Sequence, residues 1–336
     1  MIKVLPLGPV MLDLKGLELD AGEREMLCHP LTGGVILFAR NFASPEQLRA
    51  LTAAIRALRD PGLLIAVDHE GGRVQRFQQG FTRIPPMAAL ESQCASLQQA
   101  AAAARAIGTV IAHELLDHGL DFSFTPVLDV GFGRSSIIGD RAFSSDPEII
   151  VSLAGELMAG LHQGGVASVG KHFPGHGHVQ ADSHVALPID DRSRAELDQC
   201  DLLPYRRLIP AGLKAIMPAH VIFSKVDRHP AGFSSVWLKD ILRGSLGFEG
   251  MIFSDDLSME AASAAGDIVA RARAAMAAGC DMVLVCNAPA DAALLLNRLG
   301  RQELEARRAR AMRGQASLEN NAAYQAAQKL VTARFG

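Results

Sequence analysis

The chain has 336 residues, of which 49% are hydrophobic and 21% are charged, and its formal net charge is −3 at pH 7. This composition supplies ample apolar material for a buried core and too little excess charge to keep the chain unfolded. The near-neutral balance also argues against a protein whose main task is to bind nucleic acid or coat an anionic membrane, because both tasks need a basic surface. The length fits one large α/β barrel with extensions as well as it fits two domains.

Several features predict a cytoplasmic protein. The N-terminal stretch has only a short apolar run before Asp13 and lacks a small-residue cleavage site, so we predict no signal peptide. Each apolar segment is interrupted before it reaches the roughly 18 to 20 residues that cross a bilayer. The five cysteines are odd in number and show no CxxC spacing. They suit free thiols in a reducing compartment better than a disulfide or zinc framework.

Short β-rich segments recur along the chain, and most are continuous apolar runs, as expected of strands that are buried on both faces. In chain order they are Val10–Asp13, Gly34–Phe38, Leu63–Asp68, Phe124–Val130, Ala167–Phe173, Ala215–Val221, Met251–Ser254 and Met282–Cys286. Helical patterns lie between them, with helix-capping residues at several ends. The predicted helices are Pro45–Arg59, Ser96–His118, Pro147–Gln163, Ser235–Leu246 and Met259–Ala278.

This alternation of strands and helices predicts an α/β protein with a parallel sheet. Eight such strands favour closure into a single (β/α)8 TIM-type barrel, and a doubly wound open sheet is the alternative. We expect the barrel to form one catalytic domain over residues 1–300. Residues 301–336 contain no β-rich run and are expected to form C-terminal helices packed on the outside of the barrel.

Active sites of such barrels form at the carboxyl ends of the strands, so the polar residues that end each apolar run are the candidates. These residues are Asp13, Arg40, Asn41, Asp68, Glu70, Asp129, Lys171, His172, His220, Asp255, Asp256 and Asn287. So many charged groups around one mouth cost desolvation and repulsion unless a ligand uses them. Alternatively, some of them, above all Asp13, Asp129 and Asn287, cap helices or pair with one another. Long polar segments at 73–86, 131–146 and 174–191 are further candidates for functional loops.

The segment 171–184 is rich in ionisable groups, with four His, one Lys and one Asp. Asp182 precedes His184 by two residues and could fix the tautomer of its ring, which is an acid/base arrangement. Gly175 and Gly177 free the backbone of this loop, so we expect it to move. Packing roles for the other histidines and a metal site are the alternatives, although the Lys171 ammonium would repel a cation.

Asp255 and Asp256 end the seventh predicted strand. Two adjacent carboxylates cannot easily point the same way, so we expect one to face the barrel axis as a catalytic group and the other to serve a structural role in its own loop. A carboxylate on the axis suits attack on, or ionic stabilisation of, an electron-poor carbon such as an anomeric centre.

Charged side chains near these carboxylates would give a sugar hydrogen bonds that are strong and fixed in direction. The candidates are Asp68, Arg76, Arg141, Lys171 and His172, and a salt-bridge network without a ligand is the alternative reading. One Trp and two Tyr provide few stacking platforms for a long polysaccharide. An exo-acting pocket for one terminal sugar is therefore favoured over a cleft.

Several segments match a known family almost throughout the chain. They are GGVILFARN (33–41), AVDHEGGRVQRF (66–77), FSFTPVLDV (122–130), GDRAFSSDP (139–147), GKHFPGHG (170–177), DSH (182–184), IMPAHVIF (216–223) and IFSDDLSM (252–259). With these segments the sequence resembles glycoside hydrolase family 3, and within it the single-domain bacterial β-N-acetylglucosaminidases. The KHFPGHG segment followed by DSH is highly specific.

The resemblance implies a retaining hydrolysis in two steps, with Asp255 as nucleophile, His184 as general acid/base and Asp182 assisting it. It also implies a binding site for a non-reducing-end N-acetylglucosamine, formed by Asp68, Arg76, Arg141, Lys171 and His172. The implied substrate is N-acetylglucosaminyl-1,6-anhydro-N-acetylmuramic acid, with or without its peptide, in peptidoglycan recycling. We expect a small-molecule substrate, no cofactor or metal, no nucleic-acid or membrane partner, and a monomer.

Two positions depart from the family pattern. His69 stands where relatives often have Gln, and His178 adds a second ionisable ring to the loop that carries His184. Three other functions stay open at this point: a non-catalytic sensor of cell-wall sugars, a phosphorylase in which phosphate replaces water, and a metal-dependent barrel hydrolase.

Overall fold

The computed structural model describes residues 3–180, 187–302, 304–315 and 321–336. Within these residues, eight parallel strands form one sheet in the order β8-β5-β3-β2-β14-β13-β11-β9. Neighbours in the sheet also follow one another along the chain, except that the last strand, β14, lies beside the first, β2. The strands are β2 (Val10–Asp13), β3 (Thr32–Leu37), β5 (Leu64–Val67), β8 (Phe122–Ser123), β9 (Val169–Phe173), β11 (Ala215–Pro218), β13 (Met251–Asp256) and β14 (Met282–Val285).

The two ends of this sheet meet and close it. Parallel bridges join Phe122 to Ala167 and Val127 to Lys171, and the Val169 N–H donates to the Thr125 carbonyl at 2.7 Å. The predicted (β/α)8 barrel is therefore confirmed, and the open doubly wound sheet does not form. Its strands are almost fully buried, as their continuous apolar runs indicate.

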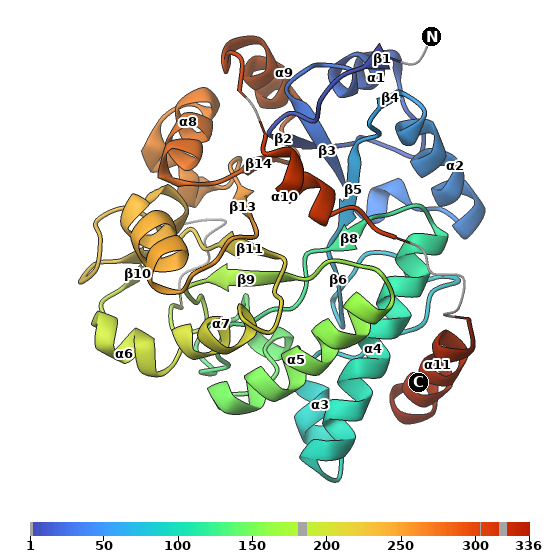
Figure 1. The fold of residues 1–336 in the computed structure, drawn as a ribbon, viewed down its shortest axis with the longest axis vertical. Coiled ribbons are helices and arrows are strands. Elements are labelled where there is room, and N and C mark those ends of the chain that lie inside the picture. The colour runs from blue at the N-terminus through green and yellow to red at the C-terminus, as the bar shows by residue number, and fades with distance from the viewer. Residues whose placement is uncertain (1–2, 181–186, 303, 316–320) are drawn as a thin grey trace.

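Helices surround the barrel (Figure 1). The α-helices up to the last strand are α1 (Ala21–Leu27), α2 (Pro45–Arg56), α3 (Ala88–Gln93), α4 (Leu97–Asp117), α5 (Pro147–Gln163), α6 (Arg194–Gln199), α7 (Leu202–Leu208) and α8 (Ile268–Ala278). After β14 come α9 (Pro289–Arg298), α10 (Ala306–Ala311) and α11 (Asn321–Phe335). Short 3₁₀ turns occupy Ala39–Asn41, Gly139–Arg141, Ala231–Phe233 and Glu260–Ala265, and a π-helix spans Val236–Ser245.

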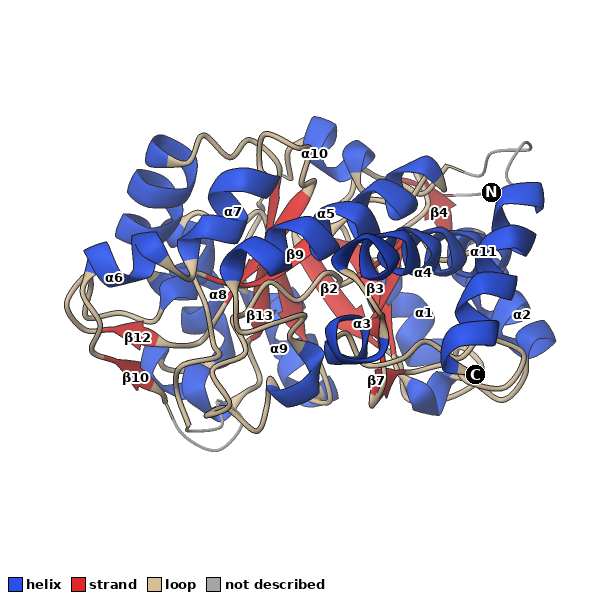
Figure 2. Ribbon diagram, turned by 90° about the horizontal axis from the view of Figure 1, so that it is seen from below, coloured by secondary structure: helices blue, strands red, loops and turns tan. Residues whose placement is uncertain are grey.

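Three small strand pairs lie at the two ends of the barrel in the described part of the chain. They are β1 (Lys3–Val4) with β4 (Arg59–Asp60), β6 (His69–Gly71) with β7 (Val74–Gln75), and β10 (Ile189–Asp190) with β12 (Ile222–Phe223). Figure 2 shows β7, β10 and β12 below the barrel strands and α10 above them. The loops that carry β7 and β10 follow the carboxyl ends of barrel strands, so the lower end in this view is the mouth.

Two predicted elements differ from the structure. The strand expected at Phe124–Val130 lies earlier, at Phe122–Ser123, because Pro126 has no N–H to continue the ladder. The helix expected over Met259–Ala278 is interrupted at Gly266, which has a φ of 99°. Asp267 then starts α8 anew by accepting a hydrogen bond from the Ala270 N–H.

Helices α4 and α5 approach each other closely through glycine. A Cβ atom on Gly108 of α4 would lie 2.1 Å from the Leu157 carbonyl oxygen, and one on Gly160 of α5 would lie 2.1 Å from the Arg105 carbonyl oxygen. Each glycine thus lets the backbone of the partner helix come into contact with its own. By contrast, Gly155 of α5 meets only a Leu208 side-chain carbon, at 3.4 Å.

The C-terminal segment closes the end of the barrel opposite the mouth. Arg308 of α10 pairs with Asp281 at 2.6 Å, and Arg313, just after α10, pairs with Asp121 at 3.2 Å. Asp281 and Asp121 directly precede the strand regions of β14 and β8. Helix α11 packs against α4 on the outside. The helices predicted for residues 301–336 are thus present, while the boundary at residue 300 between the barrel domain and its C-terminal extension stays a prediction. In the described residues, no helix has the length and apolar character needed to span a membrane.

Candidate active site

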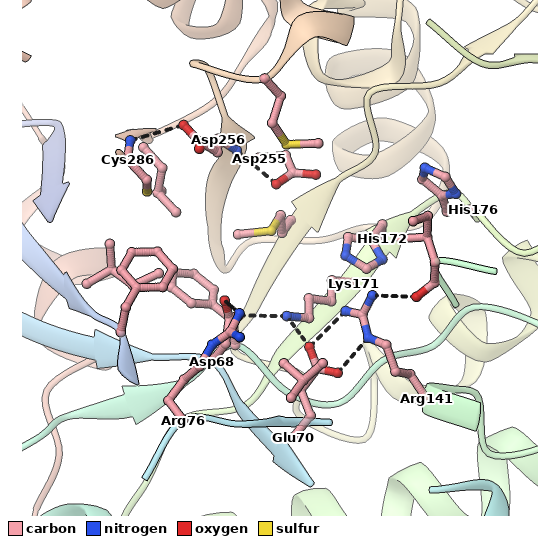
Figure 3. Close-up of a pocket in the computed structure, with 18 of the residues that line it drawn as sticks. Asp68, Glu70, Arg76, Arg141, Lys171, His172, His176, Asp255, Asp256 and Cys286 are labelled. Carbon is pink, nitrogen blue, oxygen red and sulfur yellow. Dashed lines mark hydrogen bonds and ion pairs between the residues drawn. The ribbon is translucent and has the colours of Figure 1, made fainter. Parts of the chain in front are cut away.

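A cavity of about 420 Å³ lies at the carboxyl ends of the barrel strands (Figure 3). Among the residues that line it are Asp68, Glu70, Arg73, Arg76, Arg141, Lys171, His172, His176, Asp255, Asp256, Cys286 and Asn287. The five predicted sugar-binding residues and Asp255 therefore come together from segments spread over most of the chain. Residues of the predicted loops 73–86, 131–146 and 174–191 also reach this cavity.

Asp68, which follows β5, lies between two cations. Its carboxylate accepts a hydrogen bond from Lys171 Nζ at 2.9 Å and one from Arg76 Nη2 at 3.3 Å. Burial alone would raise the pKa of Asp68, but Lys171 and Arg76 outweigh it and hold that pKa well below its usual range. Asp68 thus stays ionised, and Arg76 anchors it.

Glu70 pairs with Lys171 and with a third cation, Arg141, and was absent from the predicted binding set. Arg141 donates to it through Nε and Nη2, both at 2.8 Å, and Lys171 Nζ lies 2.5 Å from it. The Glu70 side chain is only 3% exposed. Burial disfavours charge on Lys171, yet Asp68 and Glu70 raise its pKa above the usual value. These two carboxylates and three cations form one network with directed donors, in which Glu70 and Lys171 are buried and the others are partly exposed.

His172, at the end of β9, is held from behind by Asp129. Its Nδ1 lies 2.7 Å from Asp129 Oδ2, and its backbone N–H donates to the same oxygen at 3.2 Å. The other Asp129 oxygen accepts from the His176 N–H at 2.6 Å. Burial opposes charge on Asp129, but His172 and His176 lower its pKa below the usual value. Asp129 therefore lies behind the cavity rather than among the residues that line it.

The paired carboxylates that end β13 point in different directions, as predicted. Asp256 Oδ1 accepts from the backbone N–H groups of Ser258 and Cys286 at 2.9 and 3.1 Å, and Asp256 Oδ2 accepts from the Ser258 hydroxyl at 2.7 Å. It is tied into its own loop, and burial raises its pKa to about 6. The Asp255 carboxylate faces the cavity opposite Lys171 (Figure 3), and it accepts from the Asp256 N–H at 2.8 Å.

Other polar strand ends have structural roles. Asn41 is buried and donates to the Leu14 and Gly16 carbonyls at 3.1 and 2.8 Å. Arg40 pairs with Asp13, and His220 lies 3.1 Å from the Asp256 carbonyl oxygen through Nε2. The alternative of mutual pairing thus holds for Asp13.

His69, which differs from the family pattern, lies outside the cavity lining. It is 1% exposed and sits beside the rings of Phe77 and Phe81 at centroid distances of 6.0 and 5.6 Å. Burial lowers its pKa to about 3, so the ring is neutral.

Asp182 and His184, expected to act together as acid/base, lie outside the described residues. His178 is described: its ring packs edge-on against Phe132 and its Nε2 lies 3.3 Å from Arg134 Nη1. No group of three or more His, Cys, Asp or Glu in the described part of the chain is arranged to hold a metal ion.

Comparisons with known proteins show the family to which the chain and its barrel belong. Residues 10–313 match the model of the glycosyl hydrolase family 3 N-terminal domain. The Beta-hexosaminidase of Chromobacterium violaceum is 59% identical over 296 residues, which cover 88% of this chain and 83% of that protein. The crystal structure of native NagZ from Neisseria gonorrhoeae superposes with a TM-score of 0.93 at 47% identity, covering 100% of both chains. The same NagZ has been solved in complex with N-trifluoroacetyl-D-glucosamine, also with a TM-score of 0.93.

Proposed function

The chain belongs to glycosyl hydrolase family 3 and is a glycoside hydrolase, and from this premise we propose that it is an exo-acting, retaining β-N-acetylglucosaminidase. The observation that carries the proposal is one carboxylate, Asp255, facing a small cavity whose other wall is a network of fixed donors and acceptors. A structural relative solved with an N-acetylglucosamine analogue supports an amino sugar as the ligand.

The network supplies what a terminal sugar needs. Hydroxyl groups require acceptors and donors in fixed directions, and charged partners make the stronger bonds. We assign this role to Asp68, Arg76, Arg141, Lys171 and His172, with Glu70 holding Lys171 and Arg141 in place. A cavity of about 420 Å³ suits a single sugar unit better than a polysaccharide chain.

Asp255 acts as the nucleophile in the proposed mechanism. Its carboxylate attacks the anomeric carbon as the glycosidic bond breaks, and His184 gives a proton to the departing oxygen. In the second step His184 takes a proton from water, which displaces Asp255 and restores the original configuration at the anomeric carbon. Asp182 orients the His184 ring. The unequal environments of Asp255 and Asp256 support the choice of nucleophile, because Asp256 is fully engaged in its loop.

The proposed substrate is N-acetylglucosaminyl-1,6-anhydro-N-acetylmuramic acid, with or without its peptide, in peptidoglycan recycling. We place this reaction in the cytoplasm, with the protein acting as a monomer. All five cysteines lie in the described part of the chain and none forms a disulfide, which suits a reducing compartment. Light scattering of the purified protein at several concentrations tests the monomer.

Trapping of the covalent intermediate is the decisive experiment. Incubation with a 5-fluoro-N-acetylglucosaminyl fluoride, followed by peptide mapping, is expected to find the sugar on Asp255. Asp255→Ala is expected to abolish release of N-acetylglucosamine from an aryl glycoside, whereas Asp256→Asn retains the attacking carboxylate. An adduct on another side chain, or full activity of Asp255→Ala, would refute the mechanism.

The proton donor is tested with leaving groups of different basicity. His184→Ala is expected to slow release of a poor leaving group much more than release of a good one, because a good leaving group needs little protonation. Equal losses for both would remove His184 from the acid role. Hydrolysis of the disaccharide without phosphate would exclude the phosphorylase, and any turnover would exclude the sensor.

A further inference from the structure

We propose that Asp129 is a positioning residue for substrate binding, which fixes the tautomer and the direction of the His172 ring. This inference rests on the proposed function, in which His172 binds the sugar. Asp129 does not line the cavity and touches no substrate in this assignment. It acts through the residue in front of it.

The contacts of Asp129 converge from one side of the barrel. It lies in the segment after β8, and its carboxylate accepts from two groups of His172 and from the His176 N–H, at distances of 2.6 to 3.2 Å. The residue is 1% exposed. One buried carboxylate therefore connects the segment after β8 to the end of β9 and to the backbone that follows it.

The chemistry of these contacts defines the state of the ring. An ionised carboxylate only accepts hydrogen bonds, so Nδ1 of His172 carries a proton and donates a hydrogen bond to Asp129. Nε2 is then the ring nitrogen left to meet a ligand, and His172 is one of the residues that line the cavity. A ring free to flip or to change tautomer would present the wrong atom for part of the time.

An amide cannot replace this carboxylate. Three N–H groups point at the two oxygens of Asp129, whereas an asparagine offers one oxygen and one NH₂ group. With its oxygen toward His172, the NH₂ group faces the donating His176 N–H. With its oxygen toward His176, the NH₂ group faces the His172 backbone N–H and favours the opposite tautomer. Asp129→Asn is therefore nearly identical in shape but wrong in polarity.

A double-mutant cycle with His172 tests the proposal. We expect Asp129→Asn to lower kcat/KM for aryl N-acetylglucosaminide hydrolysis by about 10- to 100-fold in the otherwise native chain, the loss expected for misplacing a charge-assisted contact. In a His172→Ala chain the same change should cost less than about 5-fold, because the residue it positions is gone. Equal factors in the two backgrounds, or native activity of Asp129→Asn, would overturn the proposal.

A matched control separates positioning from general loss of structure. Asp121 is also a buried carboxylate, but it lies at the other end of the barrel, where it accepts from the Ile65 N–H at 2.8 Å. We expect Asp121→Asn to lower the urea midpoint while its kcat/KM stays native. A loss of kcat/KM in Asp121→Asn as large as that in Asp129→Asn would show that lost stability alone explains both.

The tautomer can also be measured without a variant. In protein with ¹⁵N-labelled histidine, the ring shifts of His172 are expected to show a protonated Nδ1, with assignment by the His172→Ala spectrum. A proton on Nε2 with a bare Nδ1 would overturn the proposal. This result is independent of the proposed function, whose own failure would be a wild-type protein that releases no N-acetylglucosamine from any β-glycoside.

Discussion

Glu70→Gln, which replaces one carboxylate oxygen with an NH₂ group, should lower both the stability of the protein and its catalytic efficiency. The Glu70 carboxylate meets two cations, with Arg141 donating twice at 2.8 Å and Lys171 Nζ at 2.5 Å, and the side chain is 3% exposed. A glutamine oxygen in the place of Oε1 keeps Lys171 and Arg141 Nη2, but its NH₂ group then faces Arg141 Nε–H. The described network changes from three cations with two carboxylates to three cations with one.

Breaking a buried pair by removing one partner typically costs about 3 to 5 kcal/mol, because the remaining charge stays buried. We expect a loss of that size in the free energy of unfolding, measured by urea denaturation. We also expect kcat/KM for an aryl N-acetylglucosaminide to fall at least about tenfold, because Lys171 and Arg141 lose their fixed positions.

Glu114→Gln is the matched control for this experiment. Glu114 is also buried, but its partners are neutral: the Thr82 N–H and hydroxyl and the Tyr324 hydroxyl, all within reach of Oε1. A glutamine oxygen in the place of Oε1 retains all three, and only the second contact of the Thr82 N–H, with Oε2 at 3.1 Å, is lost, so the expected cost is below about 1 kcal/mol. Equal losses for Glu70→Gln and Glu114→Gln would refute the reasoning that charge, rather than hydrogen-bond number, makes Glu70 important.

Two further predictions concern stability. The pKa of His69 is about 3 in the folded protein and about 6.5 in the unfolded chain. Its neutral ring therefore contributes its full stability above pH 6.5, about the unfolded pKa, and this contribution is lost as the pH falls toward 3. Between pH 7.5 and 5, the free energy of unfolding of the wild type, measured by urea denaturation, should therefore fall by about 2 kcal/mol more than that of His69→Gln. The same pH dependence of stability in both proteins would contradict this prediction. Gly108→Ala should destabilise the protein by about 1 to 3 kcal/mol, because its Cβ would meet the Leu157 carbonyl oxygen at 2.1 Å. Gly155→Ala is the control and should be neutral or stabilising, because its Cβ would meet only a side-chain carbon, at 3.4 Å. Similar melting temperatures for the two alanine variants would show that α4 and α5 separate without cost.

The barrel was predictable because its strands are buried on both faces and therefore read as uninterrupted apolar runs. Val10–Asp13 and Pro147–Gln163 match the structure to the residue. Short helices such as α1 and α6 span too few turns to show a 3.6-residue period, and the sequence analysis did not detect them. The strand near Pro126 was misplaced because apolar character continues past Pro126, where the regular ladder gives way to the isolated bridge from Val127 to Lys171.

The site was predictable in part for a related reason. Residues that end barrel strands must meet at one mouth, which brought Asp68, Lys171, His172 and Asp255 into one group. The ion-pair partner of each charged residue was harder to predict from the sequence. Glu70 follows Asp68 by two residues, yet only the folded backbone shows that it receives Arg141 and Lys171. Spacing along the chain does not determine such a choice.

The arginines that follow the last strand have a consequence for biosynthesis. Without Arg308 and Arg313, Asp281 and Asp121 keep Arg243 at 3.0 Å and Arg56 at 3.0 Å as their described ion-pair partners. A nascent chain that has emerged from the ribosome only to residue 300 already holds every barrel strand but lacks this second pair of cations. The end of the barrel opposite the mouth is therefore completed last. Nonsense mutations that remove only the final helices should yield chains that proteases degrade despite an intact mouth.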